Sequence, residues 1–204
     1  MRHFLFLLVI FPLSLSAQSK IGAYLGANFP SASDPFATGD VLAEYWHPAI
    51  SVGAYYEFPL FSWVELSPFI EYNHYIFDEF HNTVTPPEPK ESSGQVSRVL
   101  RVMGEIRLLD RAANGNSAYL VTGFGYVVEK PGQINVQWVP GSAEESSSTI
   151  QFTGKDYWVQ SLGIGYQFDV SEYMAVDLCA KYYSNYRDRF AISTNVGIVF
   201  SLER

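Results

Sequence analysis

Charged residues at alternate positions of otherwise apolar segments are the first feature of this sequence that could carry chemistry. Carboxylates held near cations in a confined space have perturbed protonation, and such groups cluster at catalytic and gating sites. The same arrangement arises as a structural plug, because a buried charge is tolerated only when it is paired. We interpret the set as a plug of ion pairs facing a narrow interior, formed by Glu57, Glu65, Glu71, Glu105, Glu129 and Asp177 against Arg101, Arg107 and Lys181.

A second group of reactive side chains lies in or near segments of loop composition and comprises His47, His74, His81, Asp78, Glu79, Ser92 and Ser93. A hydrolase would need a nucleophile, a base and an orienting acid within hydrogen-bond reach of one another. The two serines lie in a proline-flanked stretch that does not preorganise them, and a pair of loop histidines is more often solvated surface than a metal site. We therefore expect no catalytic residue, no metal and no cofactor.

Eight segments with a two-residue periodicity must position these side chains. Most are about nine to fourteen residues long, the length that a tilted strand needs to cross an outer membrane. Because the number is even, both ends of the set fall on one side of the membrane. The expected strands are 20–28, 48–58, 63–76, 96–108, 117–129, 155–168, 173–184 and 190–202.

Long and short connections alternate between these segments, as external loops and periplasmic turns do in outer-membrane barrels. The long ones are rich in Ser, Pro and Gly, which predicts loops at 29–47, 77–95 and 130–154. The short ones are 59–62, 109–116 and 169–172, with a turn at Asn114-Gly115, and a short fourth external loop is expected near 185–189.

Each segment has one apolar face and one small or polar face. In the last segment Val196 and Ile198 alternate with Asn195 and Gly197. Glycine on a water-facing strand costs stability for no gain, whereas a narrow eight-stranded interior needs small residues. We therefore predict that the apolar face meets lipid and that the polar face lines the interior, with the glycines Gly22, Gly26, Gly53, Gly123, Gly125, Gly163, Gly165 and Gly197.

Aromatic residues near the segment ends are typical of the girdles that barrels place at both membrane interfaces. We assign to these girdles Tyr45, Trp46, Trp63, Tyr72, Tyr75, Trp158, Tyr182 and Tyr183. Trp138 lies in the third long connection, where an aromatic patch could bind an external ligand.

The first 17 residues have the layout of a cleavable secretory signal. Arg2 precedes the unbroken apolar stretch 4–13, and small residues end the segment at Ala17. The apolar stretch is shorter than the ~20 residues that span a bilayer. We expect export, cleavage near Gln18 and one domain over 18–204.

Charge and cysteine content exclude several classes of protein. Without the signal the chain has 12 basic and 21 acidic side chains, which argues against a nucleic-acid binder because such a protein needs a basic patch. The only cysteine, Cys179, cannot form an internal disulfide. No long apolar stretch follows the signal, so a membrane-spanning form of this chain must be a closed barrel.

Several segments resemble the PorT-like family of outer-membrane β-barrel domains common in Bacteroidetes. The resemblance lies in residues 20–29, the hairpin 52–72, the strand 163–168 and the closing strand. It covers essentially the whole mature chain and implies the fold and a membrane location. Because these are strand patterns shared by many barrels, the secretion-accessory role of the family's namesake does not transfer.

The last strand is also similar to the terminal signal that the barrel-assembly machinery reads, a pattern of polar, glycine and two apolar positions. Asn195, Gly197, Phe200 and Leu202 fit that pattern close to the C-terminus. Any amphipathic terminal strand with one glycine would fit it too.

The sequence thus predicts an all-β protein, an eight-stranded antiparallel up-and-down transmembrane β-barrel in the outer membrane. We expect a structural role or recognition by the external loops rather than a wide pore, because an eight-stranded interior has room only for its own side chains. The expected partners are outer-membrane lipids, the barrel-assembly machinery and an unknown external ligand, but no nucleic acid. The alternatives are a soluble periplasmic lipocalin-like ligand-binding barrel and a loop-based outer-membrane enzyme.

Overall fold

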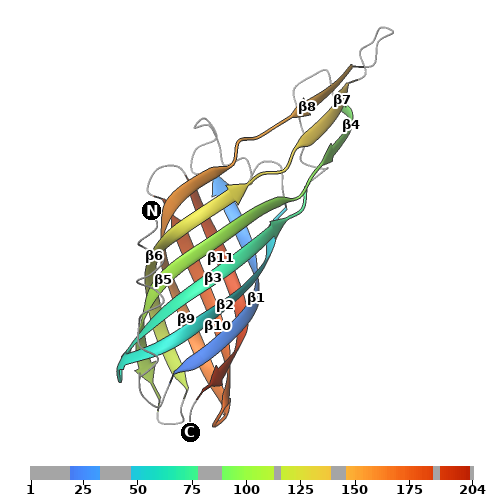
Figure 1. Ribbon diagram of the computed structural model, residues 1–204. Coiled ribbons are helices and arrows are strands. Elements are labelled where there is room, and N and C mark those ends of the chain that lie inside the picture. The colour runs from blue at the N-terminus through green and yellow to red at the C-terminus, as the bar shows by residue number, and fades with distance from the viewer. Residues whose placement is uncertain are drawn as a thin grey trace.

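Eight long strands close into a barrel in the computed structural model, which describes residues 19–32, 47–77, 89–112, 116–138, 146–185 and 189–202 (Figure 1). They are β1 (Lys20–Ala32), β2 (Ala49–Phe61), β3 (Val64–Tyr75), β5 (Ser97–Arg111), β6 (Ser117–Lys130), β9 (Lys155–Ser171), β10 (Met174–Ser184) and β11 (Arg189–Ser201). Each pairs antiparallel with the next along the chain, and β1 pairs with β11 to close the ring. The predicted eight-stranded antiparallel up-and-down barrel is confirmed.

Several barrel strands, among them β1, β2, β5 and β9, run further than the periodicity predicted. Strands β2 and β9 continue through most of the expected turns, so that only residues 62–63 and 172–173 turn the chain. Two-residue hairpin turns let strand pairing continue up to the turn itself. Residues 1–17 and the Asn114-Gly115 turn lie outside the described residues. None of the described residues forms a helix long and apolar enough to cross a membrane.

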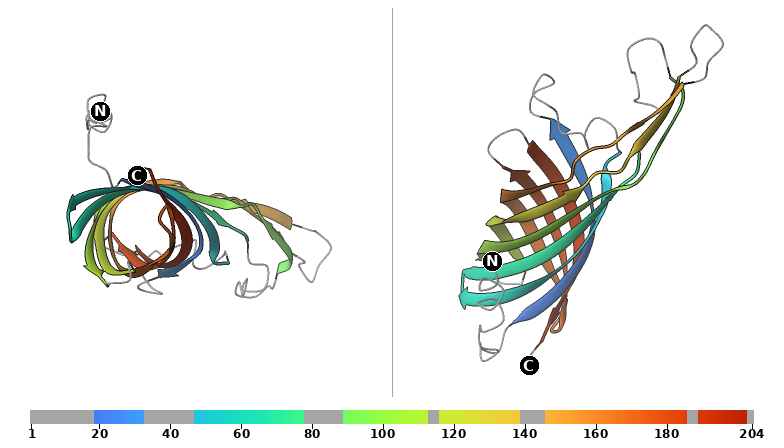
Figure 2. Two further views of the ribbon diagram at one scale, coloured as in Figure 1. Left: turned by 90° about the horizontal axis from the view of Figure 1, so that it is seen from below. Right: turned by 45° about the horizontal axis from the view of Figure 1, so that its top comes forward.

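Three further strands form a separate sheet that projects from the barrel as an arm (Figures 1 and 2). They are β4 (Pro89–Gly94), β7 (Ile134–Trp138) and β8 (Ser146–Ile150), in the order β4-β7-β8. Each is continuous in sequence with β5, β6 or β9, which are adjacent in the barrel. The arm therefore extends three neighbouring barrel strands beyond the end away from the C-terminus.

The prediction that 77–95 and 130–154 are loops is wrong where these three strands lie. The composition of these segments is loop-like, but the barrel strands that they continue already lie side by side. Pairing with an aligned neighbouring strand overrides the weak local preference of these residues for a loop. A periodic signal was present at Ile134, Val136 and Trp138, which alternate with Asn135 and Gln137.

Burial alternates along every barrel strand, and the apolar side chains are on the outside. Leu25 is 64% exposed and Val196 59% exposed, whereas Glu57 and Glu71 are fully buried. The predicted orientation is confirmed, and the reversed arrangement of a soluble lipocalin-like barrel is not found.

The inward glycines leave room for aromatic rings inside the barrel. A Cβ atom at Gly22 would overlap the ring of Tyr55, and one at Gly165 would overlap the ring of Tyr119. Gly53 accommodates Tyr24 in the same way. These positions therefore require glycine because a neighbouring tyrosine fills the space that a side chain would occupy.

Candidate functional site in the barrel interior

The structure buries all nine charged side chains of the predicted plug. Alternate residues of a strand point to opposite faces of the sheet. Arg101, Glu105 and Arg107 are separated by even numbers of residues on β5, so all three point to the same face, and we call such positions inward in parity. The least buried of the nine keeps only 4% of its surface exposed. The interior is therefore a polar core sealed from solvent by the barrel wall.

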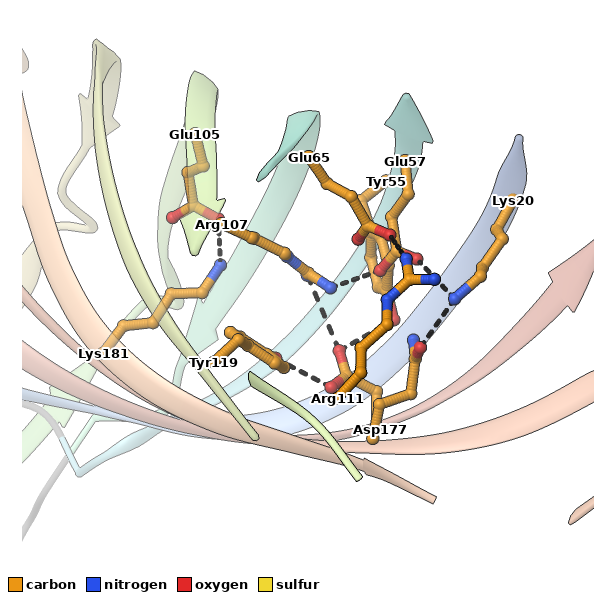
Figure 3. Close-up of polar contacts among 11 residues, drawn as sticks. Lys20, Tyr55, Glu57, Glu65, Glu105, Arg107, Arg111, Tyr119, Asp177 and Lys181 are labelled. Atoms are coloured by element: carbon orange, nitrogen blue, oxygen red, sulfur yellow. Dashed lines mark hydrogen bonds and ion pairs between the residues drawn. The ribbon is translucent and has the colours of Figure 1, made fainter. Parts of the chain in front are cut away.

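Arg107 is the centre of the lower half of this core (Figure 3). It forms ion pairs with Glu57 on β2 and, at 3.6 Å, with Asp177 on β10. Its guanidinium lies between the rings of Tyr55 and Tyr119, 4.7 Å from each ring centre. The hydroxyls of these tyrosines donate hydrogen bonds to the two oxygens of Asp177, at 2.9 and 2.7 Å.

Two cations near the lower end of the barrel complete this layer and were missed by the sequence interpretation. The Lys20 ammonium lies 3.7 Å from Glu57 and donates to the amide oxygen of Gln167 at 2.7 Å. Arg111 pairs with Glu65 at 3.1 Å. Both residues have the inward parity of their strands, so the alternation that identified Arg107 could have found them.

Arg101 is the centre of the upper half of the core, and its main partner is on an adjacent strand. Its ion-pair partner Glu71 is its direct neighbour across the β3–β5 ladder. Glu71 also accepts hydrogen bonds from Tyr24 at 2.8 Å and from Asn73 at 2.9 Å. The guanidinium of Arg101 lies 4.4 Å from the centre of the Tyr183 ring.

Lys181 and Glu105 form a third pair across the interior. Their charged atoms are 2.7 Å apart, and Ser161 donates to the other oxygen of Glu105 at 3.0 Å. The ammonium of Lys181 also lies 4.2 Å from the centre of the Phe69 ring. Glu129, higher in the barrel, accepts a hydrogen bond from Tyr157 at 3.4 Å.

Apolar side chains lie above the polar core at the base of the arm. Tyr75, Phe77 and Ile134 are buried in one cluster, with Phe152 packed against them. Gly94 of the arm approaches Phe77 so closely that a Cβ atom there would overlap its ring. The arm is thus anchored by the same cluster that covers this end of the interior.

The reactive residues of the loops do not come together in the described part of the chain. His47 is exposed before β2, and His74 points outward from β3 beside Tyr72. Ser92 and Ser93 lie in β4 of the arm. Asp78, Glu79 and His81 lie outside the described residues. Among the described residues, no group of His, Cys, Asp and Glu has the geometry to hold a metal.

Two of the expected girdle aromatics are inside the barrel instead. Tyr75 and Tyr183 are each 1% exposed, and Tyr75 donates a hydrogen bond to Asn28 at 2.6 Å. Both have inward parity, so the girdle assignment is wrong for them. Trp158 and Tyr182 are exposed on the outer wall, and Trp63 is exposed in the turn between β2 and β3, as expected. Cys179 is a buried free thiol.

The four residues of the terminal-strand pattern divide between the two faces of β11. Asn195 and Gly197 point into the interior, whereas Phe200 is exposed on the outer wall and Leu202 is exposed just after the strand. Gly197 packs closely against Tyr24 and the backbone of Ala23.

Several solved outer-membrane proteins share this fold. The attachment invasion locus protein Ail of Yersinia pestis matches with a TM-score of 0.54 at 12% identity, over 92% of this chain and all of that one. Neisserial surface protein A matches at 0.56 and 10%, over 90% and 97%. OprG of Pseudomonas aeruginosa matches at 0.54 and 8%, over 93% and 98%. No family model and no curated protein sequence matches the chain. At these identities the likeness shows the fold alone: this chain has the architecture of small outer-membrane barrels.

Proposed function

We propose that this chain is an integral outer-membrane protein with a closed interior that displays its arm outside the cell as a recognition element. The observation that carries the proposal is the apolar outer wall. Every barrel strand exposes large apolar side chains, among them Leu25, Ile50, Ile70, Val102, Leu120, Ile164, Leu178 and Val196. A continuous apolar surface of this extent would aggregate in water, and it is the surface that a bilayer requires of a barrel.

Export and assembly follow from the two ends of the sequence. Residues 1–17 serve as a cleaved signal peptide, and Asn195, Gly197, Phe200 and Leu202 serve as the signal for the barrel-assembly machinery. Membership of the PorT-like family is part of the same proposal, and the strand patterns support it.

The barrel neither conducts ions nor catalyses a reaction in this proposal. The Arg107 layer joins opposite walls through charged and aromatic groups, and the apolar cluster at Ile134 lies above it. An eight-stranded barrel has little interior space beyond its own side chains.

Recognition is assigned to the arm because it extends three strands beyond the barrel on one side. In the described part of the chain β4 and β8 are the edge strands of its sheet, and the arm is anchored at Phe77 and Ile134. The ligand is external, and the barrel holds the arm at the membrane surface.

Surface labelling tests location and display together. A Thr149→Cys variant should react on intact cells with a membrane-impermeant maleimide, because Thr149 is exposed in β8, whereas native Cys179 should stay unlabelled in the interior. The protein should also remain in the outer-membrane fraction after a carbonate wash and migrate differently on gels when unheated. Release into the soluble periplasm, or labelling of Cys179 but not of position 149, would contradict the proposal.

A further inference from the structure

Two exposed cations stand side by side at the upper rim of the outer wall, on strands β5 and β6, which also line a groove in its apolar surface. Arg98 of β5 and Lys130 of β6 are partners in the ladder, and both point outward. His74 of β3 is the ladder neighbour of Arg98 on the other side and also points outward. The chain has few basic residues and a net charge of −8. This row is therefore a positive patch on a negatively charged protein.

The row is not neutralised by the protein within the part of the chain that the structure describes. Neither Arg98 nor Lys130 forms an ion pair there, in contrast to Arg101 and Arg107 in the interior. The nearest outward carboxylate in the ladder is Asp156, one row lower on β9 and opposite Val128. Asp156 accepts a hydrogen bond from Tyr126 instead. The two cations are therefore open to an anion from outside.

The groove lies on the same strands, lower on the wall. Its floor is made by small outward residues on three neighbouring strands, Ala54, Pro68 and Gly104, and a Cβ atom added at Gly104 would meet no other atom. Phe124 of β6 and Trp158 of β9, stacked at 5.0 Å, line the groove beside this floor. The groove is almost entirely apolar and has a volume of about 620 Å³.

The separation of the cations and the groove matches one membrane leaflet. Arg98 and Gly104 are six residues apart on β5. At about 3.3 Å per residue the strand covers roughly 20 Å, and a tilt of about 45° reduces this to roughly 14 Å of depth. Half of a hydrocarbon core about 30 Å thick is roughly 15 Å. A lipid with its anionic group at Arg98 and Lys130 would reach the groove with one acyl chain laid along the tilted strands.

We propose that this wall binds one phosphorylated, acylated glycolipid of the outer leaflet, with a phosphate on Arg98 and Lys130 and an acyl chain in the groove over Gly104. The inference rests on the proposed function, since it needs the wall to be in a membrane with the arm outside. Arg is suited to the phosphate because its guanidinium can donate two parallel hydrogen bonds. His74 adds a further hydrogen-bonding side chain to the row.

A second hollow on the opposite wall provides the internal control. It lies around Ala180 and Thr194, has a volume of about 400 Å³, and has no described cation in the outward rows above it on β10 and β11. Filling this hollow with Ala180→Leu should leave lipid binding unchanged. Lys155→Gln removes an exposed cation at the same end of the barrel but outside the outward row.

The test measures lipid retained by the folded barrel. Wild-type protein and variants are purified in mild detergent, mixed with a phosphorylated lipid A preparation, and examined by native mass spectrometry. Arg98→Gln with Lys130→Gln should weaken retention by about tenfold or more, because one charge-assisted hydrogen bond contributes that order of affinity. Gly104→Leu should also weaken it, while Lys155→Gln and Ala180→Leu should match the wild type.

Three results would overturn the inference: equal retention by all variants, equal binding of dephosphorylated lipid A, or preference for phosphatidylglycerol at the same site. The gel shift of each unheated variant shows whether it is folded. Should Gly104→Leu fail to fold, the rim double variant, which changes only exposed side chains, decides the question alone. A wild-type protein that is absent from outer membranes would contradict the proposed function, whereas a membrane-inserted wild type without bound lipid A would contradict only this inference.

Discussion

The interior and the outer wall of this barrel are built from alternate residues of the same strands, yet their sequences are constrained in different ways. Inside, Arg107 is in contact with two carboxylates and two tyrosine rings, so each partner depends on the identity of the others. Outside, Val196 and Ile198 need only be apolar, because lipid chains adapt to whatever shape they present. The interior is specified by pairs of residues, whereas the wall around Val196 and Ile198 is specified by polarity.

The largest expected effect is in the interior. Arg107→Ala leaves Glu57 and Asp177 buried without their shared cation, which should lower the free energy of unfolding by ~3 to 5 kcal/mol. Urea unfolding in lipid vesicles, followed by tryptophan fluorescence, would measure it. Lys20→Gln is the matched control and should cost ~1 kcal/mol or less, because Lys20 is partly exposed. A loss for Arg107→Ala as small as that for Lys20→Gln would mean that the interior tolerates change as the wall does.

On the wall, only a change of polarity should have a large effect. Val196→Arg places a charge on the lipid-facing side of β11 and should cost ~2 to 4 kcal/mol near the midplane. Val196→Leu should be almost silent in the same unfolding assay. If Val196→Leu were as damaging as Val196→Arg, the outer face would be packed against protein rather than lipid.

Adding a single methyl group sharpens the comparison further. Gly165→Ala forces its Cβ into the ring of Tyr119, which is itself fixed by Asp177 and Arg107, and overpacking of this kind costs ~1 to 3 kcal/mol. The loss should appear as a lower urea midpoint with an unchanged slope. A neutral result would show that the tyrosine moves freely and that the interior is loosely packed.

The smallest effect is expected for the same substitution on the wall. Gly104→Ala meets no neighbouring atom, and glycine is a poor strand former, so stability should change by no more than about 0.5 kcal/mol, toward stabilisation. The same vesicle assay measures it beside Gly165→Ala. A loss equal to that of Gly165→Ala would contradict the assignment of Gly104 to the open side of the wall.

The two-residue alternation along the strands explains how much of this structure could be predicted from sequence. It assigns each side chain to one face of the sheet, and it predicted the eight strands, the apolar wall and the buried charges. It also placed Tyr75, Tyr183, Lys20 and Arg111 inside, but the first two were assigned by residue type and the last two were overlooked. The partners within the interior could not be predicted, because contact between Arg107 and Asp177 depends on the tilt and register of strands that are not adjacent. The arm was missed because its pairing is imposed by the barrel beneath it.

The pairing of the first barrel strand with the last has a consequence for the order of folding events. Lys20 is opposite Ser201, so this ladder joins positions 181 residues apart in the sequence. Contacts between such distant positions carry the largest loop-closure entropy, and they form slowly because that entropy is lost before any contact compensates it. The Glu71–Arg101 contact joins adjacent strands and needs no closed ring, whereas Arg107 meets Asp177 only when the walls come together. The β1–β11 ladder and the Arg107 contacts across the interior should therefore form together in one late kinetic step. The reverse of that step should set the lifetime of the folded barrel.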